Sequence, residues 1–251
     1  MSKFWNWRVG LAFIIVLGLI GWFSYRTWVN GARDDYQLGL TDYQQGNFDQ
    51  AIAHFTNAIT RDPRFVNAYA MRGNAYDDKG QTAQAIADYT QAIALAPNYA
   101  YSYHQRGLAY ARKGDFTQSI ADYSKAIELD PKYAHAYMSR GNAYNEQSKR
   151  EQALADFNQA ITLDPRRADF YYNRGNVYFD QNQLEQAIAD YSKALELSSD
   201  YYPALYNRGL SYQRKRSTQL AAADFETLLR LYPNHPQRGQ IELWIRDLKA
   251  R

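Results

Sequence analysis

The sequence predicts an all-α protein in which six helix-turn-helix repeats stack into a solenoid, with a membrane-spanning helix before them and a capping helix after them. The first observation is that the segment YMSRGNAY, residues 137–144, recurs with substitutions every 34 residues. The second is a set of prolines on the same period, with Ser199 in the one vacant place: Pro63, Pro97, Pro131, Pro165 and Pro233. The third is an uncharged run, residues 9–25.

A period of this length is typical of helical units that cannot bury their apolar faces alone and therefore stack on their neighbours. In residues 66–99 we expect a first helix from Val66 to Asp78, ended by Gly80, and a second from Thr82 to Leu95. Small residues are expected to let the two helices approach, and tyrosines to fill the space between them: Gly73, Ala85, Ala92, Tyr69, Tyr76 and Tyr89.

Each period contains Gly, two residues and Tyr, then Ala, three residues and an aromatic residue, and then Ala and Pro. This pattern resembles the tetratricopeptide repeat (TPR). The resemblance covers residues 32–235, divided as 32–65, 66–99, 100–133, 134–167, 168–201 and 202–235. It implies a right-handed solenoid whose first helices line a concave groove that holds a ligand. The Arg-Gly-x-Ala-Tyr variant of the motif is similar to repeats of bacterial, especially cyanobacterial, membrane-anchored proteins.

Residues 236–251 follow the last repeat and predict one more helix. Its apolar residues are spaced to form a single face: Ile241, Trp244, Ile245 and Leu248. We expect this helix to cap the apolar end of the array. The alternative is an amphipathic helix that binds a partner.

Residues 1–31 predict a single-pass anchor and a short linker, because the run 9–25 is just long enough to cross a bilayer and tryptophans lie at both of its ends. The rival, a cleaved signal peptide, lacks a good small-residue cleavage site. The flanking basic residues are nearly balanced, so orientation depends on the short head and the α-amino group. These favour an extracytoplasmic repeat domain, periplasmic or lumenal, with a cytoplasm-facing domain as the alternative.

Composition excludes several functional classes. The chain has no Cys, so disulfides, thiol catalysis and Cys-based zinc sites are absent. The net charge of +3 comes from three basic residues in 1–31, which leaves the repeats neutral and argues against nucleic-acid binding. The four histidines have no metal-ligand spacing, and no catalytic or nucleotide motif occurs. We therefore expect no enzyme, no cofactor and no metal site.

Two charged ladders follow the 34-residue period. One consists of arginines, Arg72, Arg106, Arg140, Arg174 and Arg208; the other of aspartates, Asp88, Asp122, Asp156, Asp190 and Asp224. The antiparallel helices of one repeat place each Arg level with its Asp, so we expect ion pairs that tie the two helices together. The alternative is an arginine stripe that binds an acidic partner.

The family resemblance assigns a groove to one face of the first helices. On this face we expect asparagines to bond a ligand's main chain and aromatic residues to bury its side chains. The basic clamp of the chaperone-binding branch is absent, and the alternative is a merely solvated surface. The predicted groove residues are Asn74, Asp77, His104, Met138, Asn142, Asn145, Tyr172, Asn176, Phe179 and Tyr206.

These features together predict a membrane-anchored, non-enzymatic scaffold that binds a protein or peptide segment in its groove, for assembly of a membrane-associated complex. Two alternatives stay open: a structural protein whose arrays self-associate, and an accessory subunit that presents substrates to an enzyme. The partner's identity and the oligomeric state are not determined by the sequence.

Overall fold

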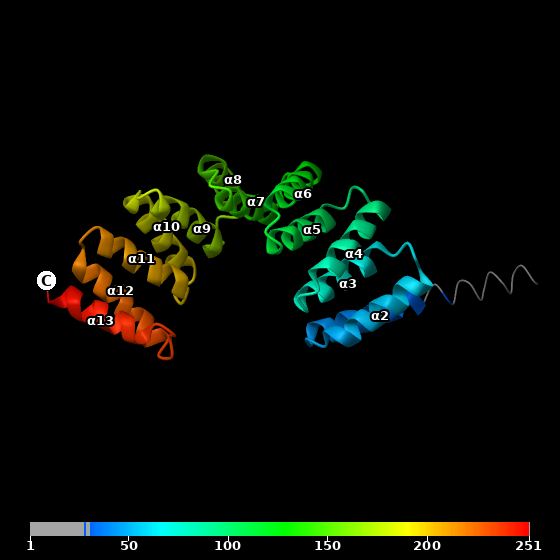
Figure 1. Cartoon of the computed structure of the whole chain (residues 1–251), viewed down its shortest axis with the longest axis horizontal. Helices are drawn as coiled ribbons and strands as arrows, with labels where there is room; N and C mark the ends of the chain where they lie inside the picture. Colours follow the sequence, from blue (N-terminus) through cyan, green and yellow to red (C-terminus); the bar gives the residue numbers. More distant parts are fainter. Residues whose placement is uncertain (1–27, 29–30, 251) are drawn as a thin grey trace, which may run out of the picture. The chain divides into compact units, whose positions relative to one another are not determined.

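The computed structural model describes residue 28 and residues 31–250, and all regular secondary structure within this part of the chain is helical (Figure 1). The chain divides into two compact units, Met1–Lys113 and Gly114–Arg251. The expected anchor, residues 9–25, lies outside the described residues. None of the described helices is both long and apolar enough to cross a membrane.

The first unit consists of successive helices that pack each against the next. Residues 31–44 are helical, and four further helices follow: α2 (Phe48–Arg61), α3 (Val66–Asp78), α4 (Thr82–Leu95) and α5 (Ala100–Arg112). The bounds predicted for the two helices of residues 66–99 are therefore confirmed.

The second unit continues the same alternation. Its helices are α6 (Phe116–Leu129), α7 (Ala134–Glu146), α8 (Arg150–Leu163), α9 (Ala168–Asp180), α10 (Leu184–Leu197), α11 (Tyr202–Arg214), α12 (Thr218–Leu231) and α13 (Arg238–Lys249). Within this unit each helix packs against the next, and the first helices of adjacent repeats also touch, α7 with α9 and α9 with α11.

The turn inside each repeat needs one residue in the left-handed region. The early repeats use glycine there, with φ of 74° at Gly80. The later repeats place Ser148, Asn182 and Arg216 at the same position, with φ between 59° and 61°. A side chain at positive φ is strained, most of all where it is neither Asn nor Asp. The left-handed residue therefore recurs at the same place in each repeat, whatever its type. The later repeats tolerate backbone strain that glycine would avoid.

Close approach of the two helices explains the glycine in the repeated motif. A Cβ atom added to Gly73 would lie 2.7 Å from the ring of Tyr89, and one added to Gly141 would lie 2.8 Å from the ring of Phe157. Both rings are fully buried. Tyr76 packs against Ala85 and Tyr89, as expected, whereas Tyr69 packs against Ala58 and Ile59 of the preceding helix instead. Both rings are only half-buried and flank the guanidinium of Arg72.

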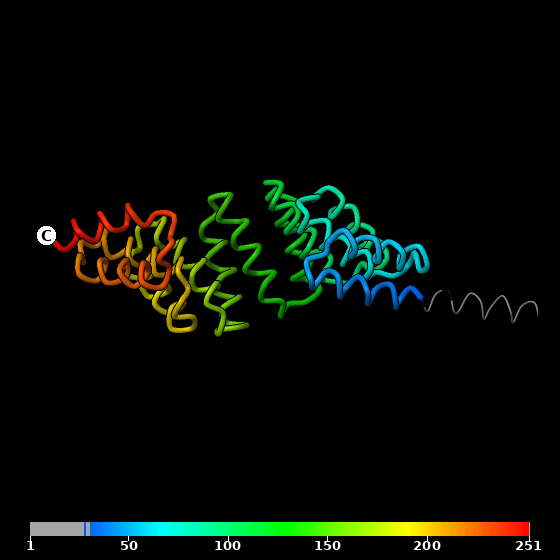
Figure 2. Tube along the Cα trace, turned by 90° about the horizontal axis from the view of Figure 1, so that it is seen from below, coloured from blue at the N-terminus to red at the C-terminus, as the bar shows by residue number. Residues whose placement is uncertain are grey.

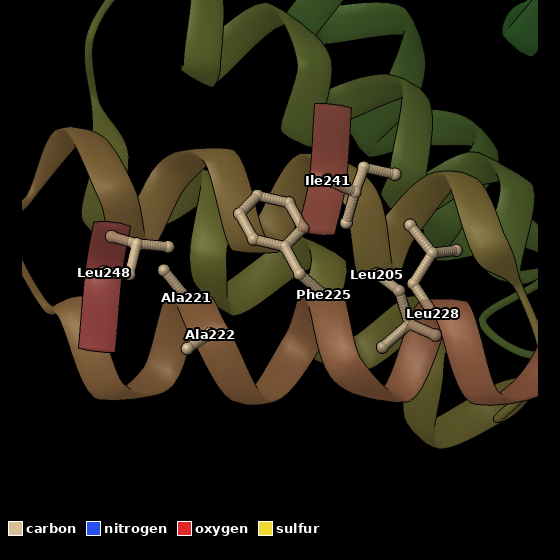
Figure 3. Close-up of a cluster of buried hydrophobic side chains, with 7 residues drawn as sticks. All are labelled: Leu205, Ala221, Ala222, Phe225, Leu228, Ile241 and Leu248. Atoms are coloured by element: carbon tan, nitrogen blue, oxygen red, sulfur yellow. The ribbon is translucent and has the colours of Figure 1, made fainter. Parts of the chain in front are cut away.

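The C-terminal helix α13 packs beside α12, as both views of the chain show (Figures 1 and 2). Its Ile241 and Leu248 are buried in a cluster with Phe225 and Leu228 of α12 and Leu205 of α11 (Figure 3). Trp244 and Ile245 pack against the same cluster. This is the packing expected of a helix that covers the apolar end of the last repeat.

Candidate functional site

Arginines and aspartates of the two predicted ladders form bidentate pairs within a repeat. In the first such pair, Arg72 donates from Nε and Nη2 to the two carboxylate oxygens of Asp88, both at 2.7 Å. The same geometry, with distances between 2.6 and 2.8 Å, joins Arg140 to Asp156, Arg174 to Asp190 and Arg208 to Asp224. The hydrogen bond to Asp156 raises the pKa of Arg140 above its ordinary value although burial opposes it. These pairs tie the two helices of one repeat together, as expected.

The same guanidinium groups also reach the preceding repeat. The Nη1 atom of Arg72 donates to the hydroxyl of Thr56 on α2 at 3.0 Å, and Arg140 donates to Ser124 on α6 at 3.0 Å. Equivalent bonds join Arg106 to Thr90, Arg174 to Asn158 and Arg208 to Ser192. The sequence analysis missed these acceptors, although their 34-residue spacing was visible. Because the guanidinium N–H groups donate to residues of the protein itself, a structural role of the arginines is favoured over a stripe that binds an acidic partner.

Asn74, a predicted groove residue, lies inside a hydrogen-bond network of the first unit. Its Oδ1 accepts from the Tyr89 hydroxyl at 2.8 Å and from Nε2 of Gln105 at 3.0 Å, and its Nδ2 donates to the Tyr101 hydroxyl at 2.7 Å. Only 7% of the residue is exposed. The network connects α3, α4 and α5, and burial raises the pKa of the Tyr89 phenol. We call this a closed junction; the expectation that Asn74 faces a ligand is wrong, because the next repeat covers it.

A second closed junction lies in the second unit. The Oδ1 of Asn176 accepts from the Tyr191 hydroxyl and from Nδ2 of Asn207, both at 2.9 Å. Asn207 also donates to the Tyr172 hydroxyl at 3.3 Å. These bonds connect α9, α10 and α11. Asn176 is half-buried, and the bonds to its side chain are both accepted by the carbonyl oxygen.

Asn142 occupies the equivalent position on α7 and is exposed. The residue opposite it on α8 is Phe157, which has no hydroxyl to donate. Among the described residues its amide has one hydrogen-bond contact, Nδ2 to the sulfur of Met138 at 3.2 Å. On the neighbouring helix Asn173 donates to the backbone oxygen of Asp169 at 2.9 Å instead of to Asn142. We call this arrangement of α7, α8 and α9 the open junction.

The other predicted groove residues differ in their accessibility. His104 is buried, with Nδ1 3.1 Å from Oε1 of Gln105, so the expectation of an exposed His104 is wrong. Asp77 forms an ion pair with Arg112. Arg214 lies over the ring of Phe179, 3.8 Å from its centroid. Asn145 and Met138 are half-buried.

Tyr172 and Tyr206 each contact both a buried cluster and an accessible pocket. Both rings pack against buried clusters of the second unit, and Tyr172 meets Tyr201 edge-to-face at 5.4 Å. Both also line a pocket of about 970 Å³ formed by α9, α11 and the segment from the end of α12 to the start of α13. Tyr172, predicted as a groove residue, therefore contributes both to the core and to an accessible pocket.

No group of three or more His, Cys, Asp or Glu within the described range could hold a metal ion. The polar networks described above connect helices.

Models of the tetratricopeptide repeat match residues 36–100, 88–121 and 203–235, and a TPR repeat model matches 110–148, 141–180 and 175–215. The chain belongs to the tetratricopeptide repeat family. Proteins of this family mediate protein–protein interactions and some bind peptides, and the fold is generally non-catalytic. No curated protein sequence matches the chain.

Solved structures with this fold cover most of the chain. PilW, titled a widely conserved type IV pilus biogenesis factor, has a TM-score of 0.77 at 19% identity over 84% of this chain and 97% of its own. PilF of Pseudomonas aeruginosa has a TM-score of 0.73 at 20% identity over 88% of this chain and 98% of its own. YrrB, titled a TPR protein with an unusual peptide-binding site, has a TM-score of 0.59 at 19% identity over 78% of this chain and 98% of its own. At these identities the likeness shows the fold alone.

Proposed function

We propose that this tetratricopeptide protein is a membrane-anchored, non-enzymatic scaffold that holds an extended segment of a partner protein for assembly of a membrane-associated complex. The observation that carries the proposal is the open junction. Asn142 presents an exposed amide at a position where two other repeats bury or engage theirs. An amide offers both a donor and an acceptor, which matches the main chain of an extended peptide.

The surroundings of Asn142 support a peptide ligand. Met138 lies beside it on α7, half-buried, and a flexible thioether adapts to apolar side chains of different shapes. On α9 the half-buried Asn176 lies one repeat away, and its bonds within the protein use the carbonyl oxygen and not the amide nitrogen. Because α7 and α9 touch, the two amides can bond one ligand at successive points of its main chain. The side chain of Asn176 is held in place by Tyr191 and Asn207, which lowers the entropy cost of binding.

Membrane attachment is the second part of the proposal. It is supported by the uncharged run 9–25 with its flanking tryptophans. A tethered scaffold meets membrane-bound partners at a raised effective concentration. We propose that the repeats lie outside the cytoplasm. PilW, by its title a biogenesis factor, shares the fold, so the fold suits an assembly role.

Cell fractionation tests the anchor. We expect the full-length protein to stay in the membrane pellet through a carbonate wash, with residues 1–26 still attached by mass spectrometry. A mature species that begins near Ala32 would contradict the anchor and favour a cleaved leader.

Affinity capture from detergent-solubilised membranes tests the groove. Asn142→Ala should lower the amount of captured partner several-fold without loss of helical circular dichroism, since the residue is exposed. Phe157→Tyr is the sharper variant, because it supplies the hydroxyl that engages the amide in the closed junctions while keeping Asn142 itself. It should also weaken capture.

Asn57→Ala on α2 is the matched control, an exposed asparagine outside the proposed surface. Its capture should equal that of the wild type. If Asn142→Ala and Phe157→Tyr both capture the same proteins in the same amounts as this control, the open junction does not bind the partner.

A further inference from the structure

The pocket at the C-terminal end of the second unit is lined by an unusual number of aromatic rings. Tyr172 from α9, Tyr202 and Tyr206 from α11, and Tyr232 and His235 beyond α12 all face its volume of about 970 Å³. This is the upper part of the range typical of ligand sites. None of the residues that line it is Lys, Arg, Asp or Glu. Burying a charged occupant there would leave that charge without a partner.

The rings form two pairs. Tyr202 and Tyr232 meet edge-to-face with centroids 5.3 Å apart, and Tyr206 stacks on His235 at 6.3 Å and 21°. Tyr202 is 46% exposed although it is a large aromatic residue at the rim of a pocket. Paired rings of this kind present flat apolar walls with hydroxyl groups at their edges.

The lining offers hydrogen-bond donors that no described residue uses up. The Nδ1 atom of His235 accepts from the backbone N–H of Gln237 at 3.2 Å, so the neutral ring carries its proton on Nε2 and can donate there. The Tyr172 hydroxyl accepts from Asn207, which leaves its own hydrogen for another acceptor. The hydroxyls of Tyr202 and Tyr206 have no hydrogen-bond partner among the described residues. The Asn207 Oδ1 is one acceptor in the lining.

We propose that this pocket binds an uncharged, proline-rich segment of a partner protein in the polyproline II conformation. Such a segment suits the lining because its carbonyl oxygens are unbonded and point outward, while proline has no N–H to leave unsatisfied in an aromatic site. Docking of proline rings on aromatic walls is an established way to recognise such segments, and the preformed conformation lowers the entropy cost. The inference rests on the proposed function only in requiring a protein partner, since the pocket lies apart from Asn142.

Fluorescence anisotropy with the full-length protein in detergent tests it. The probe is a capped, fluorescein-labelled peptide of about ten alternating prolines and leucines, and the matched probe replaces each proline by glycine. We expect the first to bind at least tenfold more tightly than the second. Tyr202→Ala should weaken binding of the proline peptide at least tenfold, because it removes one wall of the aromatic pair formed with Tyr232.

Leu231→Lys is a second variant that does not depend on the rings. Leu231 is 38% exposed, lines the pocket and ends α12, where a cation is favourable for the helix. It should also weaken binding of the proline peptide. Asn142→Ala should leave this affinity unchanged, and this result would distinguish binding in the pocket from binding at the open junction.

Three results would overturn the proposal. One is equal affinity for the two peptides, and another is no measurable binding of the proline peptide to the wild type. The third is dimerisation by light scattering that Tyr202→Ala abolishes, which would assign the pocket to a second copy of the chain.

Discussion

The closed junction around Asn74 and the open junction around Asn142 begin with the same residues. Both asparagines follow an Arg-Gly pair and precede Ala and Tyr. The difference lies fifteen positions further along the chain, where the first has Tyr89 and the second Phe157. The Tyr89 hydroxyl bonds the amide of Asn74, and Tyr101 and Gln105 of the next repeat complete the network, whereas Asn142 has no such partners in the described part of the chain and is exposed. The comparison teaches that a repeated residue acquires its role from a partner in the other helix.

Two other junctions in the same chain have leucine in place of the asparagine. Leu40 packs with Phe55 in the first unit, and Leu210 packs against the cluster that contains Phe225 in the second. There an apolar residue faces a phenyl ring, as simple packing requires. Asn142 with Phe157 belongs to neither the Leu–Phe nor the Asn–Tyr arrangement, and its exposed amide is the reason why we propose a ligand as its partner.

The largest expected effect concerns a feature that both kinds of junction share. Arg140→Ala at the open junction and Arg174→Ala at a closed one should each lower the free energy of unfolding by about 3 kcal/mol, because each strands a buried aspartate. Urea unfolding followed by circular dichroism measures both. A clear inequality between the two would mean that the junctions differ in more than one hydroxyl.

A smaller effect separates the junctions directly. Asn74→Ala should lower the free energy of unfolding by about 2 kcal/mol, because it leaves the Tyr89 hydroxyl and the Gln105 amide without their acceptor. Asn142→Ala should change it by less than about 0.5 kcal/mol, as for an ordinary surface substitution. The same urea experiment compares them, and equal losses would break the distinction between closed and open.

The smallest effect is a dependence on alkaline pH. Burial raises the pKa of Tyr191 above its ordinary value of 10.0. A raised pKa contributes stability that is complete below pH 10 and is lost as the pH rises further, because the unfolded chain then releases the proton first. At pH 11 the loss is about 1.4 kcal/mol for this group.

Tyr191→Phe should therefore lose less stability than the wild type between pH 8 and pH 11, as seen in urea midpoints at the two pH values. Tyr202→Phe, at an exposed phenol, serves as the control. A wild-type pH dependence in Tyr191→Phe would show that this phenol is not held neutral in the folded state.

Local signals allowed the helix bounds to be predicted. The ends of α3 and α4 follow from Gly80, in its left-handed turn, and from Pro97, which cannot continue a helix. The Arg–Asp pairs followed from counting positions along two antiparallel helices. Burial at the groove was harder to predict. Asn74 and His104 lie on the expected face of their helices, yet both are buried, because burial also depends on which neighbouring side chains reach across them.

The sequence by itself determined the repeat, its 34-residue period and the helix pairs, because these depend on residues near one another in the chain. It also determined which arginine meets which aspartate. The packing of the helices was needed to show which asparagines are structural, which tyrosines are core and where a pocket remains. The physical reason is that hydrogen bonds of 2.7 to 3.0 Å between three helices depend on side-chain length and direction. A pattern of residue types along one helix does not contain that information.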